Sequence, residues 1–175
     1  MAWEITAEEL LARYAAGKRN FAGVDLNPSC KYEWIELLCI DLRGINLRGA
    51  NLYRVKLGGS NLSRADCFGA YLGHAALGHI NLSRANLRGA IFEFSTMQNS
   101  DLRGADLTRA NLTSALLRGA NLTGAILEGA YLRSTNLRGV IVNNIAVDTT
   151  NALFWHTTMA DGSVEVGPTY DLVIG

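Results

Sequence analysis

Few residues in this chain could perform chemistry, and the histidines are the first to consider. His74 and His79 lie five residues apart, a spacing that could suggest a pair of metal ligands. Each follows an apolar position of a five-residue repeat by two residues, so we expect them at adjacent outward corners with no third ligand nearby. The sequence therefore predicts no metal site.

The three cysteines are a second set of reactive groups. Cys30, Cys39 and Cys67 are an odd number without metal-ligand spacing, so reduced thiols are expected. Cys67 occupies an apolar repeat position and is predicted to be a buried small hydrophobe rather than a nucleophile. Cys30 and Cys39 flank a predicted loop, where a regulatory disulfide is the less favoured alternative.

No other catalytic pattern stands apart from the repeat. The glycine-rich segment 57–60 lacks the strand-to-helix junction of a phosphate-binding loop, and neither paired carboxylates nor a serine–histidine–aspartate arrangement is visible. We therefore predict that the protein is not an enzyme and that it binds no cofactor and no small-molecule substrate.

Composition limits the class of protein further. The chain has 175 residues, enough for one ordinary domain, and its 49% hydrophobic content excludes wholesale disorder. No apolar run approaches the roughly 18 residues that a membrane-spanning helix needs. The first residues are acidic where a signal peptide is basic, so we expect a cytoplasmic protein without membrane contact.

A strict period of five residues runs from Leu42 to Val147. All 22 central positions are apolar, and leucine occupies 17 of them. The residue two before each centre is small or β-branched. The residue one before is Asn or Asp at 12 positions, and the residue two after is Gly at ten. Residues 85–89, Ala-Asn-Leu-Arg-Gly, show the complete unit.

Neither an α-helix nor a flat strand can bury a period of five. On a helix, successive centres would be displaced by about 140° and would spread around the cylinder. On a strand, the odd spacing would place successive centres on opposite faces. The chain must therefore turn once in each unit, which winds a coil with the leucine and the small residue inside. We expect a narrow, dry interior.

The repeat resembles that of the pentapeptide-repeat family, whose unit is written A(D/N)LXX. The resemblance covers residues 40–149 and implies an all-β solenoid, a right-handed quadrilateral β-helix in which four units form one square turn. The 22 units would then make about five to six coils. Residues 9–21 and 157–162 are similar to the terminal segments of cyanobacterial members.

Both ends of the chain depart from the repeat and are predicted to cover the open ends of the coil. Thr6 and Glu9 form a capping box, and the apolar spacing after them predicts an amphipathic helix over residues 7–16. The chain is divided into an N-terminal capping helix (1–20), an irregular first coil with a loop (21–39), the repeat β-helix (40–149) and a C-terminal cap and tail (150–175).

Two details of these end segments are also predicted. Leu26 and Leu37 lie eleven residues apart, which indicates a one-residue insertion in a loop over residues 27–34. Phe154 and Trp155 are expected to plug the final coil, and residues 157–166 to form a hairpin that turns at Asp161–Gly162.

If four units make a turn, outward residues twenty apart share a face. One face then carries a column of arginines, for which solubility is the simplest explanation, and the next face carries Arg48, Arg88 and Arg109. A third face is partly apolar and includes Tyr53. Single exposed apolar residues are common, but a contiguous patch of them often marks a partner site. The candidate partner-binding residues are Tyr71, Ile91, Phe94, Tyr131, Arg43, Arg64, Arg84 and Arg103.

We expect a monomeric, non-catalytic module that presents these residues to a protein partner. The alternative implied by the resemblance is DNA mimicry, because other family members inhibit DNA gyrase and protect it from quinolones. Mimicry requires an acidic surface. Residues 40–149 contain 12 basic and 7 acidic side chains, a net charge of +5 and the wrong sign. Direct nucleic-acid binding is disfavoured because the aromatic residues are not interleaved with the arginines.

Overall fold

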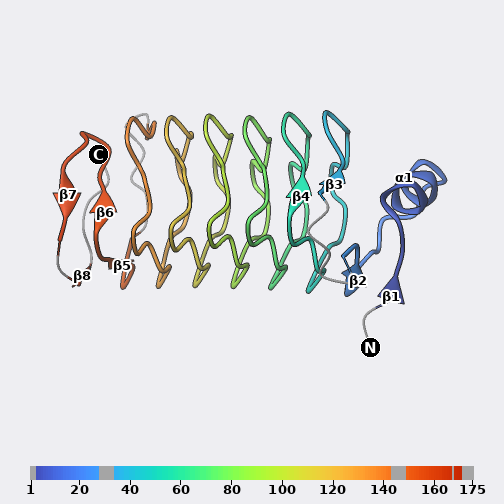
Figure 1. Ribbon diagram of the computed structural model, residues 1–175, viewed down its shortest axis with the longest axis horizontal. Coiled ribbons are helices and arrows are strands. Elements are labelled where there is room, and N and C mark those ends of the chain that lie inside the picture. The colour runs from blue at the N-terminus through green and yellow to red at the C-terminus, as the bar shows by residue number, and fades with distance from the viewer. Residues whose placement is uncertain (1–2, 28–33, 143–148, 167, 171–175) are drawn as a thin grey trace.

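The structure is a computed structural model that describes residues 3–27, 34–142, 149–166 and 168–170. It is a rod of stacked turns (Figure 1). Parallel bridges join residues twenty apart, such as Asn61 with Asn81 and Asn81 with Asp101. Four five-residue units therefore complete one turn, and each turn hydrogen-bonds to the turns beside it.

The bridges form four ladders, which define the four faces of the rod. The first face contains residues 41, 61, 81, 101, 121 and 141, the second 46, 66, 86, 106 and 126, the third 51, 71, 91, 111 and 131, and the fourth 56, 76, 96, 116 and 136. The central residues and the small residues two before them point inward and form one hydrophobic cluster that extends from Ile5 to Phe154. Burial of each leucine contributes roughly 1.5–3 kcal/mol.

The polar residues of the unit build its corner. The residue two after the centre has a positive φ, as at Gly89 with φ +62°. The turn is closed by the N–H of Ala90, which donates to the carbonyl of Leu87 at 3.0 Å. The Asn86 side-chain oxygen accepts a hydrogen bond from the N–H of Arg88 at 3.3 Å. The positive φ explains why Gly is common two residues after the centre. The side-chain hydrogen bond explains why Asn or Asp is common directly before the centre.

The predicted N-terminal helix is present as α1 (Ala7–Ala15), at the end of the rod (Figure 1). Thr6 is its N-cap and accepts a hydrogen bond from the backbone N–H three residues later, at 3.1 Å. Leu10 is buried in the hydrophobic cluster of the stack. The Tyr14 hydroxyl donates to the carbonyl of Arg43 at 2.9 Å, which joins the helix to the coil.

The stack begins before residue 40, in the segment predicted to form an irregular first coil (21–39) and in the strand that precedes α1. In the first turn, β1 (Trp3–Glu4) pairs in parallel with β2 (Val24–Asp25). Asn20 and Asp25 bridge to residues twenty-six further on, whereas β3 (Ile35–Glu36) pairs with β4 (Val55–Lys56) at a spacing of twenty.

These spacings correct the predicted insertion. The difference between twenty-six and twenty places six extra residues between Asp25 and Glu36, not one. The interval of eleven residues between Leu26 and Leu37 fits two units plus one residue as well as one unit plus six, and the spacing of leucines cannot distinguish these. The predicted loop residues 28–33 lie outside the described part of the chain.

The stack also continues past residue 149, the predicted end of the repeat. Tyr131 bridges to Leu153 and Asn136 to Thr158, both at a spacing of twenty-two residues. The two additional residues break the five-residue period in the sequence, although the ladders of the third and fourth faces continue.

The two bulky residues near this end do not act as a joint plug. Phe154, in β5 (Leu153–Phe154), occupies a central position and is fully buried. Trp155 points outward, and the Arg133 guanidinium lies 4.7 Å from the centre of its ring. The prediction is therefore wrong for Trp155, because the residue after a centre faces out of the coil.

The predicted C-terminal hairpin is confirmed. Strands β6 (Thr157–Thr158) and β7 (Val164–Glu165) pair in an antiparallel arrangement, and Gly162 has φ +92° in the turn between them. Strand β8 (Thr169–Tyr170) pairs antiparallel with β5. These strands lie at the end of the rod opposite α1 (Figure 1).

Candidate functional site

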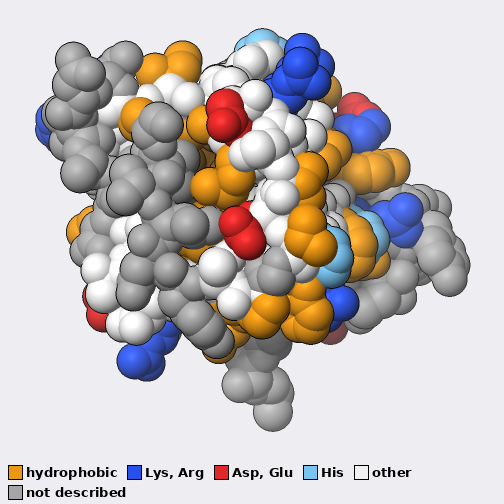
Figure 2. Space-filling model, turned by 90° about the vertical axis from the view of Figure 1, so that its left-hand side faces the viewer, with side chains coloured by type: hydrophobic (Ala, Val, Ile, Leu, Met, Phe, Trp, Pro, Cys, Tyr) orange, Lys and Arg blue, Asp and Glu red, His pale blue; other side chains and the backbone are white. Residues whose placement is uncertain are grey.

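A row of aromatic rings lies on the third face. We define the aromatic patch as Tyr53, Tyr71, His74, Ile91 and Phe94. The rings of Tyr53 and Tyr71 stack at 5.3 Å, and Tyr53 meets His74 edge-on at 5.5 Å. His74 stacks on Phe94 at 5.0 Å, and Phe94 is 55% exposed. One side of the molecule shows histidine beside hydrophobic side chains (Figure 2).

Glycine at position 73 allows Tyr71 to lie flat on the coil. A Cβ atom added to Gly73 would be 2.7 Å from the Cε2 atom of the Tyr71 ring, closer than real Cβ contacts come. The ring therefore covers the backbone of its own unit and stacks on Tyr53. Gly73 is buried beneath the Tyr71 ring, so this ring packs against the coil at the centre of the patch.

The structure does not bring Tyr131 into the patch. Tyr131 is 52% exposed and lies on the same ladder, but Asn111 stands between it and Ile91. The Asn111 amide donates to the Glu93 carboxylate at 2.7 Å and makes this turn polar. Sequence reasoning placed His74 at a solvated corner and missed its ring stacking, although a spacing of twenty residues from Phe94 was the available signal.

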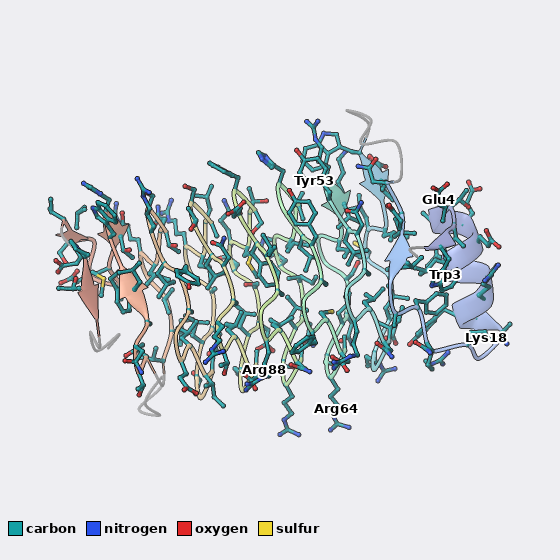
Figure 3. The ribbon with its side chains drawn as sticks, turned by 90° about the horizontal axis from the view of Figure 1, so that it is seen from below. Trp3, Glu4, Lys18, Tyr53, Arg64 and Arg88 are labelled. Atoms are coloured by element: carbon teal, nitrogen blue, oxygen red, sulfur yellow. The ribbon has the colours of Figure 1, made fainter. Side chains whose placement is uncertain are left out.

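The four predicted arginines of the first face lie together along a groove of about 1030 Å³. We call this the arginine groove. Figure 3 shows Arg64 pointing away from the rod on the side opposite Tyr53, so the groove and the aromatic patch face different directions. The residues that line the groove are Tyr14, Arg19, Asp41, Arg43, Gly44, Ser63, Arg64, Ser83, Arg84, Arg103, Gly104 and Thr123.

The arginines at the two ends of this column are paired with carboxylates of their own units. Arg43 lies 2.8 Å from Asp41, and Arg103 lies 2.6 Å from Asp101. The hydrogen bonds from these guanidinium groups hold the pKa values of both carboxyl groups below their usual range. Each carboxylate also accepts a hydrogen bond from the backbone N–H of its arginine, which fixes the pair to the coil.

Two arginines of the second face, Arg48 and Arg88, bridge successive turns. Arg48 pairs with Asp66 at 3.1 Å, and Arg88 pairs with Asp106 at 3.2 Å. Burial acts to raise the pKa of Asp106, but hydrogen bonds from Thr108 and from Arg88 outweigh it, so this pKa lies below its usual value. These arginines are engaged within the stack and offer less free charge to a ligand.

The residues first considered for chemistry are not gathered into a site. His74 and His79 lie at exposed corners, and the described residues contain no group of three potential metal ligands. Cys67 is buried as predicted, and burial raises the pKa of its thiol to about 12, with the nearby Asp66 charge acting in the same direction. Cys39 is exposed, whereas Cys30 and any pairing with it lie outside the described residues.

Within the described ranges, no helix has the length and apolar character needed to cross a bilayer. The longest helical element among them is α1, at nine residues.

Comparison with known proteins identifies the repeat. The family model described as pentapeptide repeats matches residues 37–64, 65–104 and 105–144 with 8 copies. No curated protein matches the sequence. A solved structure of the pentapeptide repeat protein Rfr23 from the cyanobacterium Cyanothece 51142 is 29% identical, covers 67% of this chain and 89% of that chain, and superposes with a TM-score of 0.61.

Two further solved structures are similar. HetL, a pentapeptide repeat protein involved in heterocyst differentiation regulation in Nostoc sp. strain PCC 7120, is 26% identical over 92% of this chain and 100% of that chain, with a TM-score of 0.33. Full-length QnrB1, a plasmid-mediated fluoroquinolone resistance protein, is 18% identical over 76% and 71%, with a TM-score of 0.51. The chain belongs to the pentapeptide repeat family and has the right-handed quadrilateral β-helix of that family.

Proposed function

We propose that this protein is a non-catalytic scaffold that binds a protein partner through the aromatic patch. The observation that carries the proposal is the continuous row of stacked rings from the half-buried Tyr53 through the exposed His74 to the exposed Phe94. Contiguous apolar surface of this kind is typical of binding sites. A cytoplasmic location in a cyanobacterium belongs to the same proposal, and the likeness to Rfr23 supports the source.

The fold itself does not require these side chains. Asn51 and Asn111 occupy the same ladder as Tyr71 and Ile91, and each Asn accepts a hydrogen bond from the backbone two residues on. Ser114 occupies the corner position of Phe94 with nearly the same φ, +58° against +56°. Polar residues therefore satisfy the coil at these positions, and the exposed rings serve another purpose.

The neighbouring turns supply the substitutions for a test. The triple variant Tyr71→Asn, Ile91→Asn and Phe94→Ser places residues already found on this face into the patch. The matched control, Leu116→Asn, Ile126→Asn and Ile141→Asn, removes three exposed apolar side chains from the other faces, whose ladders also contain Asn. We expect affinity capture from a lysate of the source cells, followed by a binding titration with the captured protein, to fail for the patch variant alone. Equal binding by wild type and the patch variant would contradict the proposal.

Inhibition of DNA gyrase is not part of this proposal. The likeness to QnrB1, at 18% identity, concerns the fold alone. The net charge of +5 over residues 40–149 has the wrong sign for a surface that imitates DNA. A gyrase supercoiling assay should therefore show no inhibition at micromolar protein, and strong inhibition would overturn this exclusion.

A further inference from the structure

The arginine groove contains two adjacent guanidinium groups that lack partners. Arg64 and Arg84 occupy the same corner of successive turns, and both are exposed. Among the described residues, neither side chain has a hydrogen bond or an ion pair, in contrast to Arg43 and Arg103 at the ends of the column. The centre of the groove therefore carries uncompensated positive charge.

The two corners fix where these side chains leave the coil. Arg64 and Arg84 have φ values of +59° and +57°, so their backbones are fixed by the turn. The aliphatic part of Arg84 lies over Gly104, where an added Cβ would be 3.7 Å from Arg84 Cγ. Arg19 extends the positive charge at the N-terminal end of the groove, where its guanidinium lies 3.9 Å from the centre of the Tyr14 ring.

The backbone N–H groups of both corners are already used by the stack. The N–H of Arg64 donates to the carbonyl of Ser83 at 2.9 Å, and the N–H of Arg84 donates to the carbonyl of Arg103 at 2.9 Å. With these donors engaged, recognition of a ligand on this face depends on the side chains. Each guanidinium group can donate two parallel hydrogen bonds to one planar carboxylate or phosphate.

The shape of the groove favours an extended chain over a single anion. Its lining residues 44, 64, 84, 104 and 123 come from five successive turns. At about 4.8 Å per turn, this spans roughly 19 Å, the length of about six residues of extended peptide. Among the described residues that line the groove, Tyr14 is the only aromatic one, and Arg19 already covers its ring, so bases would find no stacking platform.

We propose that the arginine groove binds an extended acidic segment of a partner protein, whose carboxylates pair with Arg64 and Arg84. This site lies on a different face from the aromatic patch and does not rest on the function proposed for it. The groove also differs from the second face, where each of the two bridging arginines already has a carboxylate partner.

The test uses the full-length protein and fluorescein-labelled hexaglutamate, followed by fluorescence anisotropy at low salt. Hexaglutamine and a six-nucleotide oligothymidylate are the comparison probes. We expect hexaglutamate to bind more tightly than either of them, with affinity that falls as salt is added. No binding of hexaglutamate, or tighter binding of the oligonucleotide, would overturn the proposal.

Substitutions then locate the site. The double variant Arg64→Gln and Arg84→Gln should weaken hexaglutamate binding at least tenfold. The matched control, Arg118→Gln and Arg138→Gln, removes two exposed arginines that are also twenty residues apart but belong to the fourth face, and it should weaken binding less than twofold. Arg64→Lys with Arg84→Lys keeps the charge without the paired hydrogen bonds and should give an intermediate loss. Equal weakening by the two glutamine variants would mean diffuse attraction and would refute a groove-specific site.

Discussion

At the scale of the residue, the corner of each unit imposes one backbone conformation on every side chain placed there. Gly89 has φ +62°, and Arg84, with a bulky side chain, has φ +57°. A left-handed conformation costs a non-glycine residue roughly 1–2 kcal/mol. The hydrogen-bonded ladders on both sides of the corner fix the turn, so the stack tolerates this cost at every corner that a residue other than glycine occupies.

A pair of glycine substitutions isolates this cost. Gly89→Ala should lower the free energy of unfolding by about 1 kcal/mol, because its positive φ strains the new side chain although nothing lies within 4 Å of the added Cβ. Gly78→Ala is the control, since Gly78 lacks a positive φ and its added Cβ would be 3.9 Å from the carbonyl of Gln98. Urea denaturation measures both. Equal destabilisation would show that backbone strain is not the cause.

The pair of Asp101 with Arg103 predicts a stability that depends on pH. The side-chain hydrogen bond from Arg103 lowers the folded-state pKa of Asp101, so the pair stabilises the protein above the unfolded pKa, and this contribution is lost as pH falls through the folded pKa. The variant Asp101→Asn should therefore lose less stability than the wild type between about pH 5 and pH 2.

Thermal unfolding across this acidic range provides the measurement. Glu128→Gln removes a carboxylate charge from an exposed position of the second face and serves as the control. An acid response that is identical in the wild type and in Asp101→Asn would contradict the prediction.

At the scale of the element, α1 contributes through one strongly buried side chain. Leu10 is 1% exposed within the hydrophobic cluster, whereas Leu11, its neighbour on the same helix, is half-buried. Leu10→Ala should lower the free energy of unfolding by about 2–5 kcal/mol. Both substitutions change the helix propensity equally, so Leu11→Ala, at the half-buried position, should cost less than half as much. Chemical denaturation tests the difference, and equal losses would mean that α1 does not anchor to the stack through Leu10.

The elements also show how far the sequence determines the structure. A period of five predicts the coil and the inward leucines, and the capping residue Thr6 predicts the start of α1. The position of a turn after an insertion is not predictable in the same way. The interval of eleven residues between Leu26 and Leu37 fits one extra residue as well as six, and the two additional residues between Tyr131 and Leu153 break the period without showing where the ladder resumes. The column of arginines follows from the repeat, whereas the ring stacking of His74 depends on side-chain geometry that spacing does not contain.

At the scale of the whole molecule, both ends of the rod have additional elements, α1 at one end and the β6–β7 hairpin at the other (Figure 1). A stacked coil with open ends would associate end to end through unpaired backbone and apolar side chains. We therefore expect a monomer with a mass of 18.9 kDa in light scattering. Deletion of residues 1–17 should expose Phe21 and cause association. A dimer of the intact chain would contradict this expectation.

Because each turn contains twenty residues, the number of a residue in the sequence gives its position on the surface of the rod. Moving a side chain by twenty positions shifts it about 4.8 Å along the axis, and moving it by five positions carries it a quarter turn around the rod. The outer wall between Asp41 and Ile141 is therefore a grid whose coordinates can be assigned by counting. A chosen pattern of charges or rings could be written onto this grid without altering a single buried leucine.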